Sequence, residues 1–150
     1  MPQSLSKLYI HIVFSTKKRE KSILPNIEEA LYKYINGTLK NLKSPLLAVN
    51  SVSDHIHILC VQNKNITTAE LVESIKTSSS KYLKTLDGRL INFSWQIGYA
   101  SFSVSPSKFE DVKQYITNQK EHHNREGFKE ELIRFLRKYQ INFNEKYLWD

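Results

Sequence analysis

The fold of this chain depends on residues 54–61, which read DHIHILCV. The run is short, apolar and rich in β-branched residues, which predicts a buried β-strand and not a helix. Because side chains two apart share one face of a strand, His55 and His57 point the same way, with Cα atoms roughly 6 to 7 Å apart. Ile56, Ile58 and Cys60 then point to the opposite face of the strand, where helices are expected. Two imidazoles on one strand form half of a metal site, and the alternative is two polar residues on a solvated sheet face.

Patterns on both sides of this strand predict three more strands and four helices. The strands are expected at residues 7–15, 45–52 and 101–104, and the helices begin at Pro25, at the capping box Thr67-x-x-Glu70, at a second capping box Ser107-x-x-Glu110, and at about Lys129. The short connection before the histidine strand implies an antiparallel pair. The order β-α-β-β-α-β predicts an α+β protein with a ferredoxin-like antiparallel sheet and helices on one face. The face that carries the histidines is expected to be free for a ligand, or covered by a helix from elsewhere.

Length and composition limit the classes of protein to which the chain can belong. At 150 residues the chain fits one domain, residues 1–150, and 40% hydrophobic residues with four Gly and four Pro indicate a globular fold. Lys and Arg number 22 against 15 acidic residues, so the net charge is +7, which favours a polyanionic partner. No segment approaches the ~18 apolar residues of a membrane span and no secretory signal is visible. The lone Cys60 predicts a reduced, cytoplasmic protein.

Two groups of basic residues are candidate DNA contacts. One follows the first strand, and the other lies on a hydroxyl-rich part of the second helix. They are Lys17, Lys18, Arg19 and Lys21 in the first group, and Lys76 and Lys81 in the second. Phosphate contact and simple solvation are both open for these cations. Trp95 and Phe102 are expected to be buried, while Tyr99 could pack or stack on an unpaired base.

The third predicted helix, of about 16 residues, carries the rest of the candidate chemistry. Tyr115 and Gln119 are four residues apart, so they share one helix face. Together with the histidine pair they offer two imidazoles, an amide oxygen and a phenol, which could converge on one cation. No acidic residue lies on the Tyr115 face of this helix, so a hydrolytic nuclease is disfavoured. A phenol can attack a phosphodiester once its proton is drawn off, and the resulting phosphotyrosine allows resealing without ATP.

The sequence resembles the HUH single-tyrosine transposases of very small bacterial insertion sequences, the TnpA-type or IS200-like family. The resemblance covers nearly the whole length and rests on four segments. They are YIHIVFSTK at residues 9–17, DHIHIL at 54–59, WQIGY at 95–99 with FSV at 102–104, and YITNQKEHH at 115–123. The His-hydrophobic-His motif alone is only three residues long, and its combination with the tyrosine helix is what makes the match specific.

The resemblance implies a role for each site residue. His55, His57 and Gln119 would hold magnesium or manganese, and Tyr115 on a C-terminal catalytic helix would be the nucleophile. It also implies a 5′-phosphotyrosine intermediate on single-stranded DNA, recognition of a hairpin near each element end, and a homodimer. A homodimer also follows from the chemistry, because excision cuts two ends and the chain offers one nucleophile. Two imidazoles would suit zinc equally well.

Two other functions fit the same residues. One is a repeat-associated HUH nickase that cuts palindromes without mobilising itself. The other is a non-catalytic, ferredoxin-like module that binds nucleic acid through its open face. His122 and His123 match the family pattern, but the sequence assigns them no role.

Overall fold

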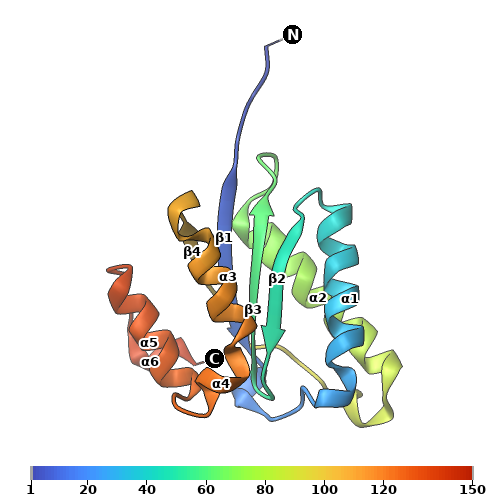
Figure 1. Cartoon of the computed structure of the whole chain (residues 1–150). Helices are drawn as coiled ribbons and strands as arrows, with labels where there is room; N and C mark the ends of the chain where they lie inside the picture. Colours follow the sequence, from blue (N-terminus) through green and yellow to red (C-terminus); the bar gives the residue numbers. More distant parts are fainter. Residues whose placement is uncertain (1, 150) are drawn as a thin grey trace.

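Four antiparallel strands form one sheet in the order β2-β3-β1-β4. The structure is a computed structural model and describes residues 2–149. The strands are β1 (Leu8–Ser15), β2 (Leu46–Ser51), β3 (His55–Gln62) and β4 (Ala100–Val104), and the α-helices are α1 (Pro25–Asn41), α2 (Thr68–Leu86), α3 (Phe109–Thr117), α4 (Gln119–His123), α5 (Phe128–Lys138) and α6 (Glu145–Leu148) (Figure 1). This order and pairing confirm the predicted ferredoxin-like α+β fold.

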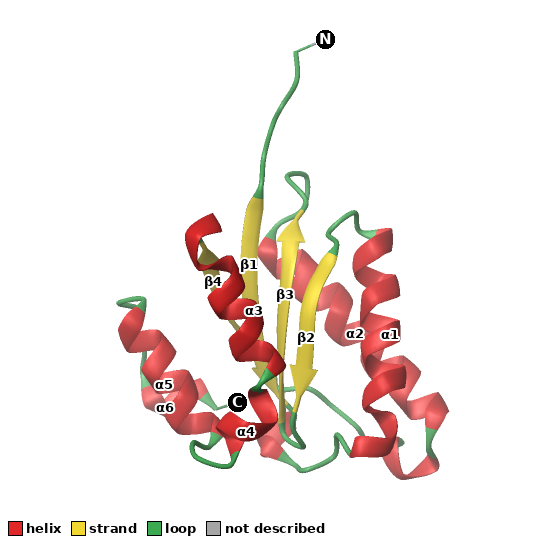
Figure 2. Ribbon diagram, viewed as in Figure 1, coloured by secondary structure: helices red, strands yellow, loops and turns green. Residues whose placement is uncertain are grey.

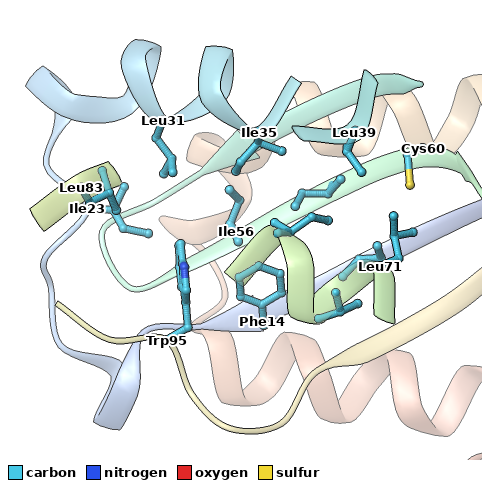
Figure 3. Packing of buried hydrophobic residues seen from close by; sticks show 14 of the residues in the cluster. Phe14, Ile23, Leu31, Ile35, Leu39, Ile56, Cys60, Leu71, Leu83 and Trp95 are labelled. Atoms are coloured by element: carbon cyan, nitrogen blue, oxygen red, sulfur yellow. The ribbon is translucent and has the colours of Figure 1, made fainter. Parts of the chain in front are cut away.

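One face of the sheet packs on α1 and α2. Ile56, Ile58 and Cys60 of β3 point to this side, as their alternation with the histidines predicts, and all three are fully buried. Figure 3 shows Leu31, Ile35 and Leu39 of α1 on the same side of the sheet as Ile56 and Cys60. The N-terminus of α2 is fixed as predicted, because Thr67 Oγ1 accepts a hydrogen bond from the Glu70 backbone N–H at 3.1 Å.

The histidine-bearing face is also covered by helices of the same chain. Figure 2 shows α3 crossing the sheet on the side opposite α2. Helix α5 presents an apolar stripe that packs on Val13 and Phe102, formed by Phe128, Leu132, Phe135 and Leu136. The sheet therefore carries helices on both faces, so of the two alternatives for the histidine face, free for a ligand or covered by a helix from elsewhere, the structure shows the second. His55 is 1% exposed and His57 is 0% exposed.

The tyrosine helix is broken where a continuous helix of 16 residues is predicted. Helix α3 ends at Thr117 and α4 begins at Gln119, because the Asn50 side chain of β2 donates to the carbonyls of Ile116 and Thr117 at 3.0 and 3.1 Å. The predicted capping box at Ser107 is also wrong. Ser107 lies in a 3₁₀ turn (Pro106–Lys108), and no side chain caps α3.

The segment between α2 and β4 closes one end of the core. Trp95 packs edge-on against Phe14 with ring centroids 4.8 Å apart, and its indole N–H donates to Ser79 Oγ at 3.0 Å. Trp95 and Phe102 are both buried, as predicted. Among residues 2–149, no helix has the length and apolar character needed to cross a bilayer.

Replacing Ile58 with alanine is expected to lower the free energy of unfolding by about 2–5 kcal/mol, because the lost atoms leave a cavity in the core. Ile97→Ala is the matched control, since Ile97 is 89% exposed and such substitutions usually stay within about 0.5 kcal/mol. Urea denaturation followed by circular dichroism measures both. Equal losses in the two variants would contradict the placement of Ile58 in the core.

Candidate active site

Strand β3 presents the two predicted histidines to one point beneath α3 and α5. The His55 and His57 rings lie 5.3 Å apart between centroids. His55 Nδ1 donates to Asp54 Oδ1 at 2.7 Å, and His57 Nδ1 shares a hydrogen bond of 2.8 Å with His11 Nε2. Partners at Nδ1 fix the orientation of each ring and leave both Nε2 atoms directed into the site, as they are in metal-binding histidines.

A carboxylate that the sequence reasoning missed lies between the two imidazoles. Glu131 Oε1 of α5 is 2.8 Å from His57 Nε2 and 3.2 Å from His55 Nε2. Glu131 occupies a position on the apolar stripe of α5, one residue before Leu132 and four before Phe135. An acidic residue on the buried face of an amphipathic helix needs a partner, and this was the available signal. The sequence argument considered acidic residues on the tyrosine helix alone, and this carboxylate comes from another helix, α5.

Tyr115 and Gln119 meet the same carboxylate. The Tyr115 hydroxyl donates to Glu131 Oε2 and accepts from Arg134 Nη2 at 2.8 Å. Gln119 Nε2 donates to Glu131 Oε2 at 3.0 Å and lies 3.2 Å from His55 Nε2. The break after α3 lets both residues reach the site, one from each helix. The four residues that the sequence proposed for chemistry are thus neighbours in the structure.

The charges around Glu131 are set by these contacts. Burial would raise the pKa of Glu131, but the hydrogen bonds from His55 and His57 outweigh it and hold that pKa well below its usual range. Burial raises the pKa of Tyr115, and the adjacent carboxylate raises it further. Burial also lowers the pKa of His57. In this state Glu131 is ionised and the Tyr115 phenol keeps its proton.

The donor set fits a divalent cation. Ligand atoms of His55, His57 and Glu131 lie within 4.8 Å of one another. Gln119 Oε1 is buried and has no hydrogen-bond partner among residues 2–149, and such an atom is costly unless something coordinates it. Two imidazole nitrogens with carboxylate and amide oxygens suit zinc, manganese or magnesium. Cys60 faces the opposite side of the sheet and cannot join them.

His122 and His123 lie beside the site. The His122 ring stacks on the Tyr115 ring, with centroids 4.4 Å apart and planes 20° apart, so it supports the phenol. His123 lies 5.7 Å from His55 between ring centroids.

The first basic group lies at the end of the sheet where His55 begins. Ser15 pairs with His55 across the β1–β3 ladder, and the next residue, Thr16, donates its backbone N–H to the Asp54 carbonyl at 2.8 Å. Four cations follow on the 3₁₀ turn η1 (Lys17–Arg19) and just beyond it, namely Lys17, Lys18, Arg19 and Lys21. They are therefore near the candidate site.

Lys76 and Lys81 of α2 lie on the other side of the sheet from Tyr115. The Lys76 ammonium donates to the carbonyls of Gln96, Ile97 and Gly98 at 2.8, 3.1 and 2.6 Å. Burial lowers the pKa of Lys76 to about 8. Lys76 thus holds the loop before β4, whereas Lys81 is exposed.

Comparisons with known proteins agree with this fold. The family model "Transposase IS200 like" matches residues 4–119. No curated protein matches. A crystal structure assigned as a transposase of Deinococcus radiodurans superposes with a TM-score of 0.62 at 20% identity, covering 79% of this chain and 98% of that one. A REP-associated tyrosine transposase bound to a REP hairpin gives a TM-score of 0.62 at 13% identity, covering 82% and 73%. The fold is that of these enzymes, and the family match shows that this chain belongs to the IS200-like transposases.

Proposed function

We propose that this transposase cuts and rejoins single-stranded DNA through a 5′-phosphotyrosine on Tyr115, with a divalent cation at the histidine pair. One observation carries the proposal. The Tyr115 hydroxyl and the Nε2 atoms of His55 and His57 contact one buried carboxylate, that of Glu131. A nucleophile and two metal-type ligands that converge on one point match the chemistry of phosphoryl transfer.

His55, His57 and Glu131 would hold the cation, and Gln119 would add its unpaired Oε1. When bound, magnesium or manganese would supply Lewis-acid polarisation of the scissile phosphate. Gln119 stays a proposed ligand, for which its side-chain amide must turn so that Oε1 replaces Nε2 beside His55 and Glu131, and Glu131 is added to the proposed set.

Two residues around the Tyr115 hydroxyl would act on it, one by orienting the phenol and the other by stabilising the negative charge that develops on its oxygen. The Tyr115 hydroxyl donates to Glu131 Oε2, a contact that orients the phenol. Because the pKa of Glu131 is lowered and that of Tyr115 is raised, the phenol proton would pass to solvent once a bound cation favours the phenolate. Arg134 Nη2 donates to the same phenol oxygen and would stabilise the phenolate. Attack forms the Tyr115 O–P bond and breaks the P–O3′ bond, and the departing 3′ oxygen takes a proton to become a free hydroxyl. Rejoining is the reverse, with a 3′ hydroxyl as nucleophile.

DNA hairpins, a homodimer and a cytoplasmic location complete the proposal. One solved neighbour is bound to a REP hairpin, and a similar hairpin is the substrate proposed here. Excision cuts two ends and each chain supplies one candidate nucleophile, so two subunits are needed.

A repeat-associated nickase is the second candidate function, favoured by likeness to the REP-associated enzyme. Both functions use the same tyrosine. A rejoining assay with two labelled strands separates them, because only the transposase produces the exchanged junction.

Tyr115→Phe is expected to abolish the covalent adduct that the wild-type protein forms with single-stranded hairpin DNA in magnesium. The variant keeps the ring and loses only the attacking oxygen. Denaturing gel electrophoresis of labelled DNA detects the adduct. Tyr34→Phe is the control, since Tyr34 stacks on Tyr82 across α1 and α2. An adduct that persists in Tyr115→Phe would move the nucleophile elsewhere and leave this mechanism unsupported.

Glu131→Gln and Asp54→Asn are both expected to weaken manganese binding, and chelation should stop adduct formation until the metal is returned. The first change removes a charged ligand. The second removes the partner of His55 Nδ1, and such losses cost about 10- to 100-fold in affinity. Titration calorimetry with Mn²⁺ measures both.

The neighbouring Glu130→Gln, on the exposed side of α5, is the matched control for Glu131→Gln. If all three variants bound manganese like the wild type, the metal site would have to lie outside this cluster.

DNA affinity is expected to fall linearly with salt on a log–log plot, with a slope of about −0.7 per phosphate contact on single strands. Lys17→Gln and Lys21→Gln should each make the slope less negative by about 0.7 if that lysine meets a phosphate. Lys40→Gln on α1 is the charge-matched control. Fluorescence anisotropy at several salt concentrations gives the slopes, and unchanged slopes in all variants would exclude this basic group from the interface.

A further inference from the structure

A groove runs between α3 and α5, outside the candidate metal ligands His55, His57 and Glu131. Its volume is about 480 Å³, within the range of about 300–1,000 Å³ typical of small-molecule sites. Residues on successive turns of α3 form one wall, residues of α5 form the other, and the end of β4 forms the floor.

The groove reaches Tyr115, the proposed nucleophile. Tyr115, Arg134 and His11 all line it. Arg134 donates to the phenol oxygen, and His11 shares its hydrogen bond with His57. A ligand in the groove would therefore lie against Tyr115.

The walls combine cations with aromatic rings. Lys108, Arg134 and Lys138 line the groove against a single acid, Asp111, whose carboxylate is 3.8 Å from Lys108 Nζ. The charge of the lining favours an anion.

The rings form a rigid stack. Phe102 lies 5.3 Å from Phe135 and 4.7 Å from Tyr139 between centroids, at interplanar angles of 23° and 27°. The Tyr139 hydroxyl donates to the Ser103 carbonyl at 3.1 Å, which fixes its ring. Phe135 and Tyr139 both face the groove. Fixed rings beside lysines are what a nucleotide base and its phosphate require.

We propose that this groove binds the nucleotide on the 3′ side of the scissile phosphate, the one that stays attached to Tyr115. The inference rests on the proposed function and adds the path of the retained strand. The base would stack on Tyr139, the partly exposed ring of the stack, and the next phosphate along the strand would meet Lys108 and Lys138.

The direction of the strand follows from in-line displacement. The departing 3′ oxygen leaves on the side of the phosphorus opposite the attacking phenol oxygen. The groove is lined by the Tyr115 ring, so it lies on the phenol's own side. The leaving strand cannot occupy it, and the retained strand can. Stacking on rings does not select one base, so this contact would accept different sequences.

The test compares two short DNAs on the Tyr115→Phe protein, where no chemistry can occur. One is trithymidylate with a 5′ phosphate and the other is trithymidylate with a 3′ phosphate, each carrying a fluorophore on its other end. The 5′-phosphorylated DNA mimics the retained strand and is expected to bind at least about fivefold more tightly than the other. Only this DNA can place its terminal phosphate beside Arg134 while its first base stacks on the groove ring, and one stacked base accounts for a difference of that size.

Two double variants, each removing two positive charges, test whether the DNA binds in the groove. Lys108→Gln with Lys138→Gln should remove the preference for the 5′ phosphate and make the salt slope less negative by about 0.7 per lysine. Lys113→Gln with Arg137→Gln is the control on α3 and α5, outside the groove lining, and should keep the preference. Circular dichroism checks that both variants are folded.

Each other outcome overturns the inference. Equal binding of the two DNAs, a preference for the 3′ phosphate, or equal effects of the two double variants would mean that the groove does not carry the retained strand. The proposed function is judged separately by the adduct of the wild-type protein. An adduct without a groove effect removes only this inference, whereas absence of an adduct removes the proposed function.

Discussion

The buried Glu131 carboxylate is the contact on which the candidate site depends. It accepts from Tyr115 and Gln119 and faces the Nε2 atoms of His55 and His57. An isolated charge in such a place would be very costly, and hydrogen bonds on every side offset that cost. The same contact joins α5, the tyrosine helix and the central strand, so the site and the cover of this sheet face form together.

Support for this contact comes from residues that take no part in chemistry. Asp54 and His11 orient the two imidazoles through their Nδ1 atoms. Asn50 ends α3 at the point where Gln119 must turn toward His55. Lys120 then ties α4 to β2 and α1, because its ammonium donates to Asn50 Oδ1 at 2.9 Å and pairs with Glu28 at 3.0 Å. The tyrosine helix is thus held against the histidines of its own chain.

Much of this could be predicted from the sequence, because period-two and helical patterns report burial directly. Ile56 and Ile58 gave the core face of β3. The expected proximity of Tyr115 and Gln119 to the histidines was correct, although a continuous helix was the wrong reason for it, since the two residues lie on α3 and α4. The break at Asn118 could not be predicted, since it depends on Asn50 from a distant strand. Glu131 was missed for a similar reason. Its partners lie on three other elements, and only its place among apolar residues of α5 hinted at burial.

The central claim is that the histidine pair, Glu131 and Gln119 hold one divalent ion beside the Tyr115 hydroxyl. Anomalous diffraction from crystals soaked in manganese tests this most directly. The account predicts one strong peak bonded to both Nε2 atoms, to a Glu131 oxygen and to Gln119 Oε1. Crystals without manganese in this cluster, in which the Nε2 atoms of both histidines still face Glu131 directly, would contradict the claim.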